Sequence, residues 1–180
     1  RDVTDERKIQ DKLKFLATID SLSGLYNRAE FMNLAKREFA WAKTSNEELS
    51  LLIMDLDNFK NINDSFGHAA GDEMIREIGS IIMTSFRKTD IAGRIGGEEF
   101  AVVLKNASLE EAKKVAEKFR ETVARRKVIY EGQEISSTVS IGVAAIRGNT
   151  DDINNIEDIL KMADDALYKA KAKGRNCVAT

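Results

Sequence analysis

Two neighbouring carboxylates in the motif GGEEF, at positions 96–100, are the first candidates for chemistry in this chain. The motif lies between two apolar runs typical of strands, 91–95 and 100–104. Two glycines between such runs predict a tight hairpin turn in which both have positive φ. Glu98 and Glu99 would then stand at the hairpin tip, where carboxylates can hold Mg²⁺ and leave room for substrate phosphates. Taken alone, the motif is more typical of a turn followed by solvated acids.

A second acidic element follows the apolar run 49–54, which has the length expected of a buried central strand. Asp55 and Asp57 stand at the exit of this strand, where they can meet the acids of a neighbouring hairpin. Two separated carboxylate groups that converge on one point are the usual protein part of a two-metal phosphoryl- or nucleotidyl-transfer site. The alternative is that both aspartates only end the strand and start a turn. Together with Glu98, the arrangement favours a metal site.

These motifs belong to four blocks that resemble the GGDEF domain, the diguanylate cyclase, in its GGEEF form. The blocks occur in the family's order and cover nearly everything from Asp20 to Val178. They are 20–28 (DSLSGLYNR), 55–63 (DLDNFKNIN) with 66–68 (FGH) and 71–72 (GD), 94–100 (RIGGEEF), and 163–176 (ADDALYKAKAKGRN). Ser23 departs from the threonine that is usual in the family, but it keeps the hydroxyl group.

The resemblance implies a metal centre and a catalytic set. Mg²⁺ or Mn²⁺, two ions per active site, would be held by Asp55, the backbone carbonyl of Leu56, Glu98 and Glu99. Glu98 or Glu99 would also assist in deprotonating the attacking hydroxyl group. Arg94 would stabilise the phosphoryl group that is transferred.

The resemblance also implies a GTP-binding set. Asn63 and Asp72 match the guanine-reading pair, although helix capping is an alternative for both, with Asp72 expected in the first turn of its helix. Lys171 and Arg175 match the positions that bind the β- and γ-phosphates; from the residues alone they indicate cations at a helix C-terminus. The glycines of the motif let a nucleotide approach the backbone. The full substrate-binding set is Phe59, Lys60, Asn63, Asp72, Gly96, Gly97, Lys171 and Arg175.

Arg87 and Asp90 form an RxxD motif five residues before Gly96. Residues three apart in this way often form a weak surface ion pair. In the family, RxxD at this offset is the site at which the product inhibits. The resemblance therefore implies a product-inhibition site at Arg87 and Asp90.

Hydrophobic periodicity predicts the elements that position these residues. Helices are expected at about 28–43, at 59–63 as a short turn, from about residue 70, from Ser108 with a capping box to Glu111, and over 156–170 with Gly174 as the C-cap. Strands are expected up to Asp55, in the GGEEF hairpin, and as one long strand over about 135–146. The order predicts an α+β fold in which helices cover a sheet that contains antiparallel strands. The resemblance adds the ferredoxin-like palm of nucleotide polymerases and class III cyclases, with a mostly antiparallel central sheet.

Residues 1–19 are expected to form an N-terminal signalling or linker helix, and residues 20–180 the GGDEF domain. Ile9, Leu13 and Leu16 make a narrow apolar seam, suited to a two-stranded coiled coil. A surface helix packed on its own domain is the alternative. The first eight residues resemble the junction that follows a PAS sensor, which implies a sensor domain upstream. The absence of an initial Met leads us to expect a fragment of a longer protein.

Bulk properties exclude several classes of protein. A net charge of −2 does not provide the basic face that nucleic-acid binding needs. The single cysteine excludes an internal disulfide and fits a reducing compartment. The chain lacks an apolar run long enough to span a membrane, so this segment is expected to be cytoplasmic without direct membrane contact, although the full protein could be anchored upstream.

The sequence thus indicates a diguanylate cyclase that condenses two GTP into cyclic di-GMP and two pyrophosphates. One domain binds one GTP, so two domains must face each other as a homodimer. The main alternative is a catalytically silent domain that binds GTP or cyclic di-GMP. Another is a cyclase with a mixed guanine–adenine product, which Asn63 and Asp72 weigh against.

Overall fold

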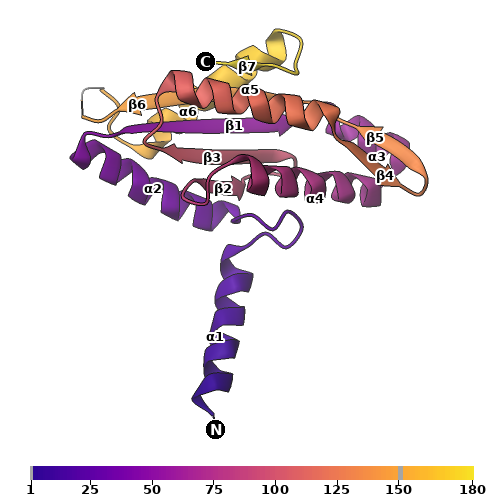
Figure 1. Cartoon of the computed structure of the whole chain (residues 1–180), viewed down its shortest axis with the longest axis horizontal. Coiled ribbons are helices and arrows are strands. Elements are labelled where there is room, and N and C mark those ends of the chain that lie inside the picture. The colour runs from indigo at the N-terminus through magenta and orange to yellow at the C-terminus, as the bar shows by residue number, and fades with distance from the viewer. Residues whose placement is uncertain (1, 150–151) are drawn as a thin grey trace.

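The computed structural model describes residues 2–149 and 152–180. A five-stranded sheet with helices on both faces forms the body, and one helix projects from it (Figure 1). The elements are α1 (Val3–Thr18), α2 (Arg28–Ser45), β1 (Glu48–Leu56), α3 (Phe59–Phe66), α4 (His68–Ser85), β2 (Ile91–Arg94), β3 (Glu99–Lys105), α5 (Leu109–Arg125), β4 (Lys127–Tyr130), β5 (Gln133–Ser136), β6 (Val139–Arg147), α6 (Ile156–Ala172) and β7 (Val178–Ala179).

The sheet has the strand order β2-β3-β1-β6-β7, with β1 in the centre. β1 pairs antiparallel with both β3 and β6, and only β6 and β7 run parallel. Residues 49–56 of β1 are all buried because both faces of the central strand are covered. This explains why the strand is one continuous apolar run, and it confirms the expected α+β fold with a mostly antiparallel sheet.

Side chains of β1 alternate between two separate cores. Leu52 and Met54 pack on the face covered by α4 and α5. Leu51 and Ile53 pack on the opposite face, against α2 and α6. Asp55 continues the second series, so the strand directs its carboxylate towards the α6 side of the sheet.

Local signals set the limits of several helices. The predicted capping box forms at α5, where Ser108 accepts from the backbone of Glu111 and the Glu111 side chain accepts from that of Ser108. Asn27 and Asn155 cap α2 and α6 with their side-chain oxygens, which accept from the backbone N–H groups of Glu30 and Asp158. Gly174 follows α6 with φ 109°, a backbone conformation for which glycine is favoured.

The prediction of one long strand over 135–146 was wrong. β5 ends at Ser136 and pairs with β4 in a separate two-stranded sheet, whereas β6 starts at Val139 in the main sheet. The hairpin β4–β5 turns at Glu131 and Gly132, which have φ values of 48° and 76°. A two-residue turn with positive φ at both positions is the signal that could have identified this hairpin.

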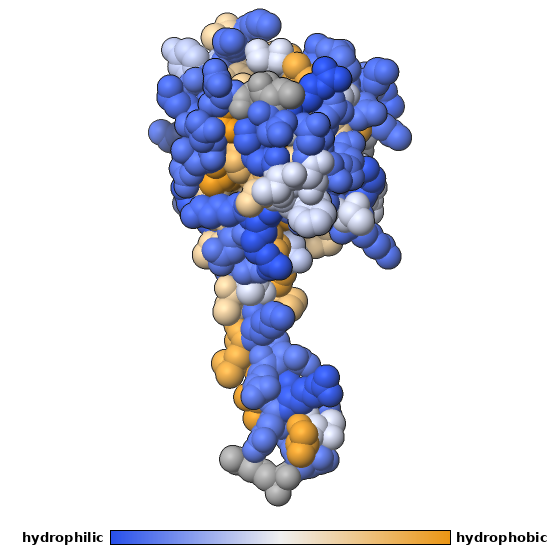
Figure 2. All heavy atoms as spheres, turned by 90° about the vertical axis from the view of Figure 1, so that its left-hand side faces the viewer, coloured by the Kyte–Doolittle hydropathy of each residue, from blue (hydrophilic) through white to orange (hydrophobic). Residues whose placement is uncertain are grey.

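Helix α1 extends away from the domain and buries none of its residues (Figure 1). Leu13 and Leu16 are 61% and 63% exposed. Apolar side chains lie along the length of this projecting helix, here called the stalk, in Figure 2. The alternative in which this helix packs on its own domain is therefore wrong for this chain. Within residues 2–149 and 152–180, none of the helices combines the length and apolar character that crossing a membrane requires.

Candidate active site

Asp55 and Glu99 lie opposite each other at one end of the central sheet. They are register partners on β1 and β3. Each continues the alternate residues of its strand that pack towards α2 and α6, Ile53 on β1 and Ala101 on β3. The Lys171 ammonium, in the last turn of α6, donates to Asp55 Oδ2 at 2.7 Å. The Asp55 side chain is only 11% exposed, whereas that of Lys171 is 36% exposed, so water reaches the pair from the lysine side. Two strands and a helix thus bring together residues that are 44 and 116 positions from Asp55 in the sequence.

The GGEEF loop is closed by backbone hydrogen bonds rather than by left-handed glycines. The backbone N–H groups of Ile95 and Gly96 donate to the Glu99 carbonyl at 2.9 and 3.2 Å. The φ angles of Gly96 and Gly97 are outside the left-handed region, so that part of the turn prediction was wrong. A Cβ on Gly96 would lie 2.7 Å from Glu99 Oε2, so a larger residue there would displace the Glu99 carboxylate.

Carboxylate crowding shifts the ionisation of Glu99. Burial raises the pKa of Glu99 above its ordinary value, and the charge of Asp55 raises it further. Asp164 and Glu98 also raise this pKa, against the opposing effect of Lys171. A divalent cation would offset this repulsion, because hard cations prefer oxygen ligands of this kind.

The oxygen atoms at this end of the sheet are of the kind that such a cation binds. Asp55, Glu98 and Glu99 supply carboxylate oxygens, and Leu56 N–H donates to the Glu98 carbonyl at 3.2 Å, which ties the loop to the end of β1. Over the described part of the chain, no three His, Cys, Asp or Glu side chains stand close enough to make a metal site as they are. Lys171 instead supplies the positive charge next to Asp55.

Arg94 braces the loop. Its Nε and one terminal nitrogen donate to the Gly97 carbonyl at 3.0 and 2.8 Å, and the other terminal nitrogen lies 3.3 Å from the Asp20 carboxylate. Arg28 donates to the Ile95 carbonyl at 2.9 Å from the other side. The guanidinium that was predicted to be catalytic therefore holds the loop to the segment that follows α1.

A cavity of about 420 Å³ opens beside these acids, between α2, α6 and the sheet. Glu99 and Asp164 line it together with Arg28 and Lys161. The acidic end of the sheet is thus accessible from this cavity, which both acidic and basic side chains line.

The predicted guanine-reading pair lies where α3 meets α4. Asn63 belongs to α3, and its buried Oδ1 has no hydrogen-bond partner within residues 2–149 and 152–180. Asp72 is exposed on α4 and directly follows Gly71, where a Cβ would lie 1.9 Å from that oxygen and 3.1 Å from the Phe59 ring. Glycine at position 71 therefore leaves Asn63 and Phe59 the space they occupy.

Asp72 is not a helix cap. Helix α4 starts at His68 rather than near Ala70, so Asp72 lies in its second turn, and the first turn contains no acid. A capping role needs a side chain at the first residues of the helix. The expectation of a first-turn position was wrong, and Asp72 is an exposed carboxylate one residue after Gly71.

The predicted phosphate-binding cations come from two elements of the fold, α3 and the end of α6. Lys60 is exposed in the first turn of α3. Lys171 and Arg175 lie at the end of α6, and Arg175 has φ 66°, in the left-handed region. The Arg175 side chain makes no hydrogen bond or ion pair with any residue that the structure describes.

Asp57 serves a different purpose from Asp55. Its carboxylate accepts hydrogen bonds from Thr138 Oγ1 at 2.7 Å, Ser140 Oγ at 2.6 Å and the backbone N–H of Asn176 at 3.0 Å. Sequence reasoning grouped both aspartates as acids at the exit of a strand and did not identify this anchoring. The partners lie more than 80 positions away, so no local signal could have identified them.

Comparison with known proteins agrees with this geometry. The model of the family "Diguanylate cyclase, GGDEF domain" matches residues 17–177. This chain belongs to the GGDEF family. Diguanylate cyclase A of Treponema denticola is 40% identical over 91% of this chain and 44% of its own length. Diguanylate cyclase DgcM of Escherichia coli K12 is 38% identical over 98% of the chain and 42% of its own length. The chain thus spans less than half of these curated relatives.

Solved GGDEF structures share the fold. The coiled coil and GGDEF domain of DgcB from Caulobacter crescentus, in complex with c-di-GMP, superposes with a TM-score of 0.91 at 29% identity, covering 98% of this chain and 92% of that one. The active GGEEF domain of a diguanylate cyclase from Vibrio cholerae gives 0.79 at 35% identity, covering 85% and 95%. The alignment with the first of these structures covers 98% of this chain and so includes the projecting helix α1.

The RxxD motif of this GGDEF domain lies apart from the acids, at the start of β2. Arg87 forms an ion pair of 3.0 Å with Asp90 and also donates to the Lys105 carbonyl at 2.6 Å. The Asp90 side chain is 2% exposed, whereas that of Arg87 is 57% exposed. Cavities of about 390 and 270 Å³ adjoin the pair, and both are lined by Phe86 as well.

Proposed function

We propose that this GGDEF domain is the catalytic part of a diguanylate cyclase. Two GTP molecules, one on each of two facing domains, would give cyclic di-GMP and two pyrophosphates. The observation that carries the proposal is the opposition of Asp55 and Glu99 in register at the end of the sheet, with Lys171 2.7 Å from Asp55. All acids and glycines of the family motif are present, which supports an enzyme rather than a silent binding domain.

The guanine base would lie between α3 and α4. The guanine edge offers two adjacent N–H donors, which the exposed Asp72 carboxylate can accept. Asn63, whose buried Oδ1 has no partner among the described residues, would be the second member of the pair. Adenine would set an acceptor against the carboxylate, so the pair supports selection of GTP over ATP.

The triphosphate would extend from α3 towards the end of α6. Lys60, Lys171 and Arg175 supply positive charge along this path, and Gly96 and Gly97 leave the backbone of the loop accessible. Bound Mg²⁺ or Mn²⁺, two ions in the proposal, would be held by Asp55, the Leu56 carbonyl, Glu98 and Glu99 and would stabilise charge on the phosphate oxygens.

In the reaction, the 3′-hydroxyl of one GTP attacks the α-phosphorus of the other, and the bond to the β-phosphate oxygen breaks. Pyrophosphate leaves with the electron pair of that bond. Glu99, whose pKa is raised by burial and by Asp55, is suited to accept the proton of the hydroxyl group. Arg94 would act by holding the loop that carries Glu98 and Glu99.

Incubation of the chain with GTP and Mg²⁺, followed by mass spectrometry of the products, tests the proposal. We expect cyclic di-GMP and pyrophosphate from GTP and no cyclic product from ATP alone. Asp72→Ala should lower the preference for GTP over ATP about tenfold, because guanine donors lose their acceptor. Binding of GTP without any product would support the silent domain instead.

We further propose that Arg87 and Asp90 bind the product, cyclic di-GMP. The exposed Arg87 can bind a phosphate and stack on a base, and cavities adjoin it on two sides. Arg87→Ala should relieve inhibition by added cyclic di-GMP without lowering the initial rate. Equal affinity for cyclic di-GMP in the wild type and the variant, measured by titration calorimetry, would reduce the motif to a surface ion pair.

A further inference from the structure

The loop that follows α6 has an unusual backbone. Gly174, Arg175 and Asn176 are three successive residues in the left-handed region, with φ values of 109°, 66° and 47°. Left-handed backbone is readily adopted by glycine and tolerated by asparagine, but it is unfavourable for a residue such as arginine. Contacts around the loop must therefore hold Arg175 in this conformation.

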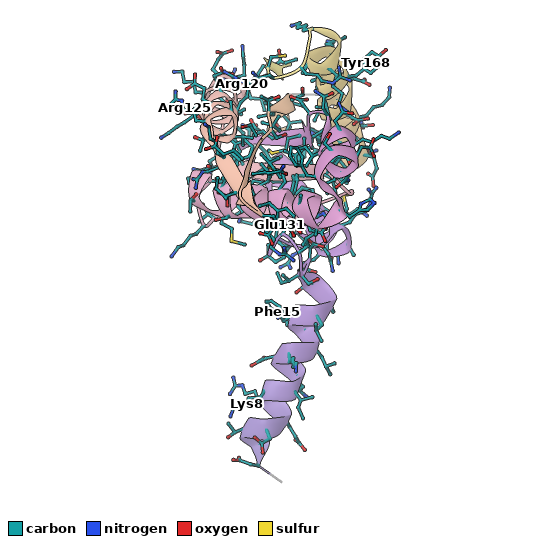
Figure 3. The ribbon with its side chains drawn as sticks, turned by 90° about the vertical axis from the view of Figure 1, so that its right-hand side faces the viewer. Lys8, Phe15, Arg120, Arg125, Glu131 and Tyr168 are labelled. Atoms are coloured by element: carbon teal, nitrogen blue, oxygen red, sulfur yellow. The ribbon has the colours of Figure 1, made fainter. Side chains whose placement is uncertain are left out.

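Two hydrogen bonds from outside the loop hold Asn176, the residue next to Arg175. Its backbone N–H donates to Asp57 Oδ2 at 3.0 Å, and its side-chain oxygen accepts from Arg120 at 2.7 Å. Arg120 belongs to α5 and is labelled in Figure 3. Its Nε donates to the two carboxylate oxygens of Glu117 at 3.1 and 3.0 Å, which orients it. Asp57 is 6% exposed and is itself fixed by Thr138 and Ser140.

Both flanks of Arg175 are thus tied to the end of β1. On the helix side, Lys171 pairs with Asp55; on the other side, Asn176 is held by Asp57. Between these ties, the Arg175 side chain is exposed and makes no hydrogen bond or ion pair within the described residues. Of the sequence Asp55-Leu56-Asp57, the first aspartate therefore holds the end of α6 and the second holds the loop that follows it.

We infer that Asp57 and Arg120 are positioning residues, which hold the Arg175 guanidinium ready to bind the triphosphate. The inference rests on the proposed function, in which Arg175 binds the β- and γ-phosphates. Asp57 is not a further metal ligand, because three hydrogen-bond donors already occupy its carboxylate. Arg120 acts from a helix that carries none of the residues assigned to GTP.

Binding of GTP and of GMP, each with Mg²⁺, tests the inference, because GMP lacks the phosphates that Arg175 would contact. We expect Arg120→Ala and Asp57→Asn each to weaken GTP binding about tenfold, the usual scale for losing a hydrogen bond to a charged group. GMP binding should change by less than about twofold. Arg125→Ala, on the same helix and labelled beside Arg120 in Figure 3, is the matched control and should bind both nucleotides like the wild type.

A double-mutant cycle separates positioning from general stability. In an Arg175→Ala background, Arg120→Ala should cause no further loss of GTP affinity. Equal weakening of GTP and GMP, or additive losses in the cycle, would overturn the inference, and so would unchanged GTP binding by Arg120→Ala. If Arg175→Ala alone leaves GTP binding unchanged, the proposed phosphate role of Arg175 fails and the inference fails with it. Arg120→Ala keeps the test valid even if Asp57→Asn does not fold.

Discussion

Helices α1 and α5 have nearly the same length, 16 and 17 residues, but opposite surroundings. Helix α5 buries four residues, and its Phe119 ring lies 5.5 Å from that of Phe86. Helix α1 buries none, and its seam residues Leu13 and Leu16 remain exposed.

The comparison shows that one chain supplies all the packing that α5 needs but none of the packing that the apolar seam of α1 needs. An isolated helix of this length is marginal in water, so α1 needs packing that the domain does not supply. A second copy of the seam would supply it as a two-stranded coiled coil, and a homodimer is also what the proposed reaction of two GTP molecules would require. Folding of the domain and association of the stalk should therefore respond to different mutations.

The largest effect should come from a change that touches neither helix. Asp55→Ala removes the carboxylate at the end of β1, and product formation should fall about a hundredfold or more. Sedimentation and circular dichroism should match the wild type. Asp64→Ala, an exposed aspartate on α3, is the control and should keep full activity. Full turnover by folded Asp55→Ala would refute the metal assignment.

Core truncation in α5 should destabilise the domain, whereas truncation in α1 should not. Phe119→Ala should lower the free energy of unfolding by about 3–5 kcal/mol, because Phe119 is 1% exposed and leaves a cavity. Leu13→Ala should change it by less than about 0.5 kcal/mol at a protein concentration where the chain is monomeric. Denaturant titration measures both. Similar losses in the two variants would show that α1 packs on its own domain.

Association should depend on the seam of α1. Leu13→Lys places a charge in the apolar seam, so specific activity should fall several-fold at low protein concentration and recover at high concentration. Thr4→Lys adds the same charge nine residues away, on the opposite face of the helix, and should have little effect. Specific activity of the wild type that is independent of concentration, over a range where sedimentation shows monomer, would contradict the stalk as a dimerisation element.

The smallest effect concerns Asp20, in the segment that joins α1 to the rest of the domain. Burial raises the pKa of Asp20, but hydrogen bonds from Ser23 and the charge of Arg94 outweigh it, so the net pKa is lowered. The charged form therefore stabilises the folded state above the unfolded pKa, and this contribution is lost as pH falls through the folded pKa. Thermal melts should show Asp20→Asn to be less stable at neutral pH, with the difference from wild type vanishing in acid. A difference that stays constant with pH would exclude this ionisation as its cause.

Local patterns predicted many elements of the fold well. The capping box of α5 and the central strand β1 needed only neighbouring residues, because helix starts and buried strands have short-range signals. The hairpin β4–β5 also carries a local signal, Glu131-Gly132, which was overlooked. The glycines of GGEEF misled in the other direction, because they predicted positive φ at both positions and neither glycine has it.

The sequence by itself determined the family, the acids at the ends of two strands and the apolar seam of α1, since each depends on residue types at short spacing. The exposure of that seam came from the structure. Only the tertiary structure decided which partner each acid has. Asp55 meets Lys171, Asp57 anchors Asn176, and Arg94 reaches Asp20, over separations of 116, 119 and 74 positions. The reason is physical: side chains two positions apart on a strand share a face, but sheet register and helix packing select what lies against that face.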